Sequence, residues 1–202
     1  MSIAELFGVP RLAATGYETS MRTRLLLRAI LAIIVLAGAS ADAADELKVG
    51  DPAPLFTAKT HDGSDFDLAS RKGQWTVLYF YPKAGTPGCT KQADAFRDNI
   101  KAIRDQGAEV YGISTDSVEA QAAFHKEQQL VFILLADPDG VVTEQYGAKM
   151  PVLTLAKRWT FIIGPDLTIR QVQHDVDPTM DAQRVAAEIQ RLKGSAASTP
   201  TS

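Results

Sequence analysis

Short apolar runs alternate along most of the chain with segments in which apolar residues recur every three or four positions. The runs are rich in β-branched and aromatic residues and are bounded by turn-forming residues, which is typical of strands. Strands are therefore predicted at residues 57–60, 65–68, 75–81, 109–113, 131–135, 159–163 and 168–174.

The segments with three- and four-residue spacing predict helices. One follows Cys89 and stops before Gly107, and another begins near residue 177 and ends at Gly194. Two more are predicted at residues 116–128, where residues 116–119 have the three-residue offset of a capping box, and at residues 142–146. The residues expected to share one face are Ala93, Phe96, Ile100 and Ile103 in the first helix, Val118, Ala122 and His125 in the second, and Ala182, Val185, Ile189 and Leu192 in the last.

The order of these elements indicates the fold class. Residues 75–81 are apolar without strict alternation, as expected for a strand covered on both faces. Turn residues at 61–64 and 164–166 join neighbouring strands as hairpins. We therefore expect an α/β fold whose mixed sheet has parallel central strands, an antiparallel edge pair and flanking helices.

Composition narrows the possible functions. The chain has 202 residues, of which 46% are hydrophobic and 22% are charged, and this composition suits a globular domain. Its net charge of -3 gives no sign of the basic surface that binds nucleic acid. A single cysteine excludes an intrachain disulfide and a thiolate-rich zinc site. The three histidines, His61, His125 and His174, show no ligand spacing, so neither a metal nor a cofactor is expected.

The N-terminus resembles a targeting segment rather than part of the fold. Basic residues follow Met21, an apolar run spans residues 29–39, and small residues then permit cleavage after Ala41 or Ala43. The expected organisation is a non-native leader at 1–20, a signal peptide at 21–41, a domain at 42–193 and a flexible tail at 194–202. Export, in a bacterium to the periplasm, leaves no membrane contact after cleavage; an uncleaved membrane anchor is the alternative.

Cys89 lies where the strand at 75–81 has ended and a helix begins. The thiolate is the reactive form of cysteine, and the unpaired N–H groups of a helix start favour negative charge there. Thr86 and Thr90 add hydroxyl groups nearby. The alternative interpretation is a small buried hydrophobe, the commoner fate of a free cysteine.

Pro82, Thr86 and Cys89 form a Pro-x-x-x-Thr-x-x-Cys pattern that resembles the active-site motif of the peroxiredoxins. The wider sequence at 80–90 looks like the bacterioferritin comigratory protein (PrxQ) branch, and the likeness runs from about residue 47 to residue 192. The resemblance implies a thioredoxin-like fold and a thiol peroxidase that reduces hydrogen peroxide and organic hydroperoxides in antioxidant defence and redox homeostasis.

The same resemblance assigns roles to residues. It makes Cys89 the peroxidatic nucleophile, Thr86 a hydrogen-bond partner of peroxide and thiolate, and Pro82 a shield of the pocket. Arg158, which precedes an apolar strand, matches the arginine that this family brings to the cysteine, with Arg97 and Lys157 as competitors. The backbone N–H groups of Gly88 and Cys89 would help to stabilise the leaving oxygen.

One departure from the family pattern changes the expected chemistry. Many members of this branch carry a resolving cysteine five residues after the first, where this chain has Asp94. The expected reductant is therefore an outside thiol, either a small molecule or a thioredoxin-like or glutaredoxin-like protein. The branch also suggests a monomer or weak dimer. Gly164, where relatives often have Asp, is a second departure with little expected consequence.

Three other functions fit parts of the sequence. A non-catalytic redox-sensing or thiol-binding module could keep the cysteine without turnover. A thiol–disulfide oxidoreductase would need a second cysteine in a Cys-x-x-Cys motif, which the chain lacks. A cysteine hydrolase would need a histidine placed to activate Cys89, and nothing in the sequence places one.

Overall fold

The computed structural model describes residues 46–197, and the predicted leader, signal peptide and cleavage sites lie outside them. Its sheet has the strand order β2-β1-β5-β4-β3-β6-β7. The strands are β1 (Thr57–Thr60), β2 (Asp65–Asp67), β3 (Trp75–Phe80), β4 (Ala108–Ser114), β5 (Ile133–Ala136), β6 (Thr160–Ile163) and β7 (Ile169–Gln173). The helices are η2 (Leu68–Arg71), α2 (Pro87–Arg104), α3 (Val118–Glu127), α4 (Val141–Gln145) and α5 (Asp181–Ala197).

The directions of the strands confirm the predicted mixed sheet. Strands β3, β4 and β5 run parallel, whereas β1 pairs antiparallel with β2 and β5, and β6 pairs antiparallel with β3 and β7. The central strand β3 is buried along almost its whole length, as its unbroken apolar sequence requires.

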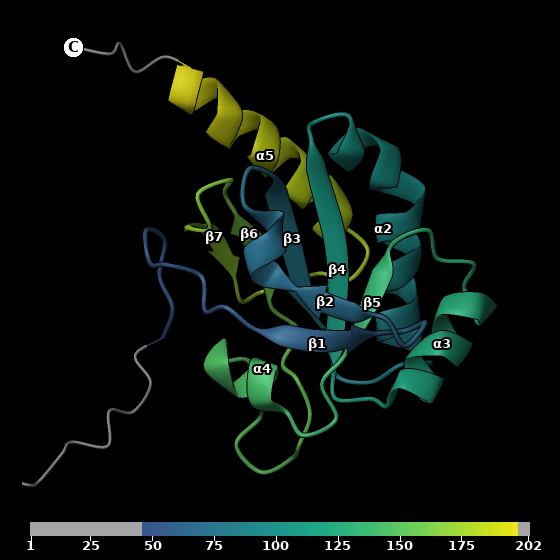
Figure 1. The fold of residues 1–202 in the computed structure, drawn as a ribbon. Coiled ribbons are helices and arrows are strands. Elements are labelled where there is room, and N and C mark those ends of the chain that lie inside the picture. The colour runs from purple at the N-terminus through teal and green to yellow at the C-terminus, as the bar shows by residue number, and fades with distance from the viewer. Residues whose placement is uncertain (1–45, 198–202) are drawn as a thin grey trace, which may run out of the picture. The chain divides into compact units, whose positions relative to one another are not determined.

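Helices cover the two faces of this sheet. Helices α2 and α5 pack against each other (Figure 1) and bury their apolar stripes with Tyr79 and Tyr81 on one face. The other face is covered by α4, η2 and the segment before β1, whose core residues include Phe56, Leu68 and Tyr146. No helix among residues 46–197 combines the length and the apolar character that a membrane span needs.

Several local predictions are wrong in detail. Ser117, not Asp116, caps α3 by accepting from the N–H of Ala120. The buried face of α3 is formed by Gln121 and Phe124, so the expected face of Val118, Ala122 and His125 is only half-buried. Helix α5 continues through Gly194 to Ala197, and residues 194–197 are therefore helix rather than tail.

Gly112 in β4 is needed for the packing of the central aromatic cluster. A Cβ atom at this position would lie 2.6 Å from the Cζ atom and from the hydroxyl oxygen of Tyr79. Tyr79 is fully buried and stacks on Phe96 of α2 at a centroid distance of 4.6 Å, so the ring cannot move away freely. The absent side chain of Gly112 thus lets β4 approach the ring directly.

We predict that Gly112→Ala lowers the free energy of unfolding by about 1–3 kcal/mol through overpacking. Urea denaturation of the full chain would measure it. Gly194→Ala is the matched control, because a Cβ atom at residue 194 meets nothing within 4 Å and should raise helix stability by up to about 1 kcal/mol. An equal response of both variants would contradict the packing role of Gly112.

A stacked histidine pair joins the β1–β2 turn to α3. The rings of His61 and His125 lie 3.7 Å apart with an interplanar angle of 15°. Burial lowers the pKa of His125, and the neighbouring His61 lowers it further, because protonation would place a charge inside a partly desolvated stack.

A lowered pKa in the folded state means that the unfolded chain binds more protons in the window below the ordinary histidine value of about 6.5. The stability contributed by neutral His125 is therefore present above this window and is lost as the pH falls through the folded-state pKa. We predict that His125→Phe, which keeps a ring without titration, loses less stability than the wild type between neutral and mildly acidic pH. Thermal unfolding across that range measures the difference, and parallel curves would exclude the effect.

Candidate active site

Cys89 is the third residue of α2, and its side chain is only 1% exposed. The Thr90 N–H donates to the Thr86 carbonyl at 2.9 Å, which is the first turn of the helix. The N–H groups of Gly88 and Cys89 precede that bond and so have no intrahelical acceptor. The sulfur thus lies where unpaired N–H groups and the helix dipole favour negative charge, as the sequence predicted.

Arg158 reaches this sulfur because of the way β6 pairs with β3. The two strands are antiparallel, and Trp159 accepts a backbone hydrogen bond from Phe80 at 2.7 Å. The start of β6 therefore lies beside the end of β3, where the loop to Cys89 begins. The Nη2 atom of Arg158 lies 3.4 Å from the Cys89 Sγ atom.

Gly88 makes room for the guanidinium. A Cβ atom at this position would lie 3.2 Å from Arg158 Nη2, so a side chain here would press on the arginine. Gly88 therefore serves the site in two ways: it lets the Arg158 guanidinium come close to the helix start, and it offers its backbone N–H. No positive φ is involved, and the requirement is purely one of space.

A residue not predicted from the sequence also contacts the arginine. Gln92, fully buried one turn after Cys89 on α2, accepts a hydrogen bond from Arg158 Nη1 through its Oε1 atom. Its signal in the sequence is a polar residue on the otherwise apolar face of the helix. With Cys89 and Gln92 together, the guanidinium has partners on two successive turns.

The loop before α2 is held by the end of β4. Asp116 accepts hydrogen bonds from the Ala84 N–H at 2.8 Å and from the Ser114 hydroxyl at 2.7 Å. Pro82, Thr86 and Gly88, all in the segment that leads to Cys89, are each half-buried. The Thr86 hydroxyl donates to the Lys83 carbonyl at 3.0 Å, so its oxygen keeps lone pairs that can accept.

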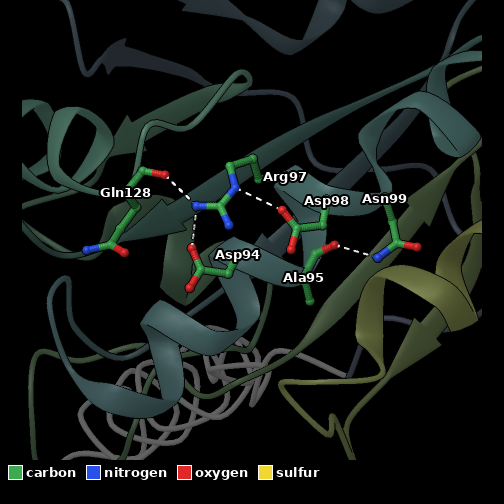
Figure 2. Close-up of polar contacts among 6 residues, drawn as sticks. All are labelled: Asp94, Ala95, Arg97, Asp98, Asn99 and Gln128. Carbon is green, nitrogen blue, oxygen red and sulfur yellow. Dashed lines mark hydrogen bonds and ion pairs between the residues drawn. The ribbon is translucent and has the colours of Figure 1, made fainter.

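The two competing cations lie elsewhere. Arg97 pairs with Asp94 at 2.7 Å and Asp98 at 2.9 Å, and it donates to the Gln128 carbonyl at the end of α3 at 2.8 Å (Figure 2). Lys157 donates to the Gly147 carbonyl at 3.0 Å and lies over the Trp159 ring. Arg97 therefore ties α2 to α3, and only Arg158 of the three contacts the sulfur.

Asp94 lies five residues after Cys89, at the position of the resolving cysteine in the family pattern. It lies in the intact helix, where its carboxylate holds Arg97 (Figure 2). Five residues of helix place it about 7.5 Å farther along the axis and about 140° around it from Cys89. Even a thiol at that position would reach the sulfur only after the helix unwound.

The sequence and the fold of this chain match those of known proteins. Residues 49–172 match the model of the AhpC/TSA family. The chain belongs to the AhpC/TSA family. It is 41% identical over 132 residues to a putative peroxiredoxin bcp of Coxiella burnetii, covering 62% of this chain and 87% of the relative. Over 135 residues it is 41% identical to peroxiredoxin Bcp of Escherichia coli K12, covering 64% and 86% respectively.

Solved structures support the same assignment. Peroxidoxin BcpB of Mycobacterium tuberculosis superposes with a TM-score of 0.69 at 34% identity, covering 73% of this chain and 99% of that protein. Bacterioferritin comigratory protein of Xanthomonas campestris superposes with a TM-score of 0.65 at 25% identity, covering 70% and 99%. The fold is thioredoxin-like, and the activity of this AhpC/TSA chain is that of a thiol peroxidase.

We predict that Arg158→Ala slows the oxidation of Cys89 by peroxide at least about tenfold, equivalent to about 1.4 kcal/mol of transition-state stabilisation. Stopped-flow measurement under single-turnover conditions gives the rate. Arg97→Ala removes a cation from the same helix region without touching the sulfur, and its rate should stay within about twofold of the wild type. An unchanged rate in Arg158→Ala would remove this residue from the site.

Proposed function

We propose that the chain reduces hydrogen peroxide and organic hydroperoxides at Cys89 and that a thiol from outside the chain completes each cycle. The observation that carries this proposal is the contact of 3.4 Å between Arg158 Nη2 and Cys89 Sγ at the start of α2. It joins a fixed cation to a buried sulfur beside unpaired helix N–H groups, an arrangement suited to an anionic nucleophile.

The oxidative step transfers one oxygen atom. The Cys89 thiolate attacks one oxygen of the peroxide, the S–O bond forms as the O–O bond breaks, and the sulfur loses two electrons. The departing hydroxide or alkoxide carries the negative charge and takes a proton to leave as water or an alcohol. Arg158 and the N–H groups of Gly88 and Cys89 stabilise this charge as it moves from sulfur to oxygen.

Two neighbours orient the peroxide in this scheme. The Thr86 hydroxyl, with its proton engaged by Lys83, offers its lone pairs to the O–H of a hydroperoxide. Pro82 lies at the start of the loop and limits the access of water to the sulfur. The loop is pre-organised for this task by the hydrogen bond from Ala84 to Asp116.

The reductive step needs two outside thiols because the chain contains one cysteine. The first thiol condenses with the sulfenic acid, which releases water and leaves a mixed disulfide. The second attacks the outer sulfur, restores Cys89 and leaves with the first thiol as a disulfide. Small thiols and thioredoxin-like or glutaredoxin-like proteins are the candidate reductants.

The proposal also covers the peroxide substrates of this chain, its cellular location and its oligomeric state. The bacterioferritin comigratory protein of Xanthomonas campestris has alkyl peroxide reduction activity, which supports organic hydroperoxides as substrates here. The signal-like pattern after Met21 supports export, to the periplasm in a bacterial cell, with an uncleaved anchor as the alternative. We propose a monomer or weak dimer.

We predict that one equivalent of peroxide, added without a reducing thiol, converts Cys89 to a sulfenic acid that a dimedone probe traps. With glutathione present, intact mass spectrometry should show a mixed disulfide, followed by turnover. Cys89→Ser should lower peroxide consumption at least about a hundredfold, because no other nucleophile replaces the thiolate.

Asp94→Ala is the matched control, since it changes the same helix without removing a group that reacts. Consumption by the wild type no faster than by Cys89→Ser would overturn the proposed function. Oxidation of Cys89 without turnover by any of the three reductant classes would instead favour the redox-sensing alternative.

A further inference from the structure

The carboxyl group of Asp181 is buried behind the arginine that contacts Cys89. Asp181 is the first residue of α5 and is 0% exposed. Its Oδ2 atom accepts hydrogen bonds from Gln92 Nε2 at 2.6 Å and from the Thr160 hydroxyl at 2.9 Å. Its Oδ1 atom is also buried and has no hydrogen-bond partner within the described residues.

The chemistry of the donors and acceptors determines which way the Gln92 amide points. A guanidinium can only donate, so the amide group facing Arg158 must be the carbonyl oxygen. A carboxylate can only accept, so the group facing Asp181 must be the NH₂. Asp181 thus holds the amide in the one orientation in which Gln92 can accept from Arg158.

Sequence spacing explains how these side chains meet. Thr160 is the first residue of β6 and Arg158 lies two residues before it, so both side chains come from the start of this strand. Gln92 lies one helical turn after Cys89 and shares its side of α2. Because α5 packs on α2 over this face, its first residue closes a continuous chain from Thr160 through Asp181, Gln92 and Arg158 to the sulfur.

We propose that Asp181 is a positioning residue: through Gln92 it holds the Arg158 guanidinium against Cys89, so that α5 takes part in setting the reactivity of the thiol. The consequence for peroxide reduction rests on the proposed function. Burial raises the pKa of Asp181, against the hydrogen bonds from Gln92 and Thr160 and the charges of Arg158 and Arg184. Packing of α5 alone requires no buried carboxyl, since an apolar side chain of similar size would avoid the desolvation cost.

Two substitutions separate positioning from packing. Asp181→Leu keeps much of the volume and removes both acceptor oxygens, whereas Asp181→Asn keeps the volume and one acceptor for Gln92. We expect Asp181→Leu to slow the oxidation of Cys89 by peroxide about tenfold and Asp181→Asn to recover most of the rate. Gln183→Ala, an exposed change on the same helix, should leave the rate within about twofold.

A double-mutant cycle tests whether Asp181 acts through Gln92. If it does, Gln92→Leu alone slows the reaction as Asp181→Leu does, and adding Asp181→Leu to Gln92→Leu has no further effect beyond about twofold. If the leucine variant at 181 does not fold, Asp181→Asn carries the same cycle, because its smaller loss of rate should also vanish without Gln92.

Alkylation of Cys89 by iodoacetamide reports the nucleophilicity of the sulfur without using peroxide, and we expect the same order of rates and the same lack of additivity. The alkylation assay keeps the test of Asp181 separate from the test of the proposed function. A wild type that is alkylated rapidly but does not consume peroxide would contradict the peroxidase proposal and leave the role of Asp181 standing. Wild-type alkylation rates in both variants at 181, or a full additional loss in the Gln92→Leu background, would overturn the role of Asp181.

Discussion

A guanidinium beside a buried sulfur stabilises negative charge only if the two groups are held at a fixed separation. Here the groups come from distant parts of the chain, with Cys89 at the start of α2 and Arg158 before β6. Their distance of 3.4 Å depends on the antiparallel pairing of β3 with β6, on the space left by Gly88 and on the second partner, Gln92. The loop, the helix start and the central sheet all contribute to this one contact.

The polar groups behind the site form a layer between α2, α5 and the sheet. Buried polar atoms in this layer are expensive unless they are paired, and pairing gives each group a required orientation. The Gln92 amide is oriented by a donor on one side and an acceptor on the other. On the opposite side of the loop, Asp116 links the Ala84 N–H to the Ser114 hydroxyl. The reactive segment is thus supported from two directions by groups that do not react.

The sequence alone was sufficient to predict the order of the elements and to single out Cys89 as the proposed nucleophile. The apolar stripe of α2, buried at Ala93, Phe96 and Ile103, follows from a period of 3.6 residues that needs no tertiary information. The same holds for the strand-to-helix junction at Cys89. Arg158 could be named only through the motif of a family, because no local pattern distinguishes it from a surface charge at a strand edge.

Tertiary structure decided which polar residues act together. Asp116 and Ser117 both suit a helix cap, and the loop at Ala84 determines that Ser117 caps α3 while Asp116 faces the site. Gln92 and Asp181 lie 89 residues apart, so their contact has no local signature and arises from the packing of α5 on α2. Helix periods and turn residues are short-range properties that a sequence displays directly, whereas partners across a sheet depend on the long-range pairing of strands and helices, which only the folded chain defines.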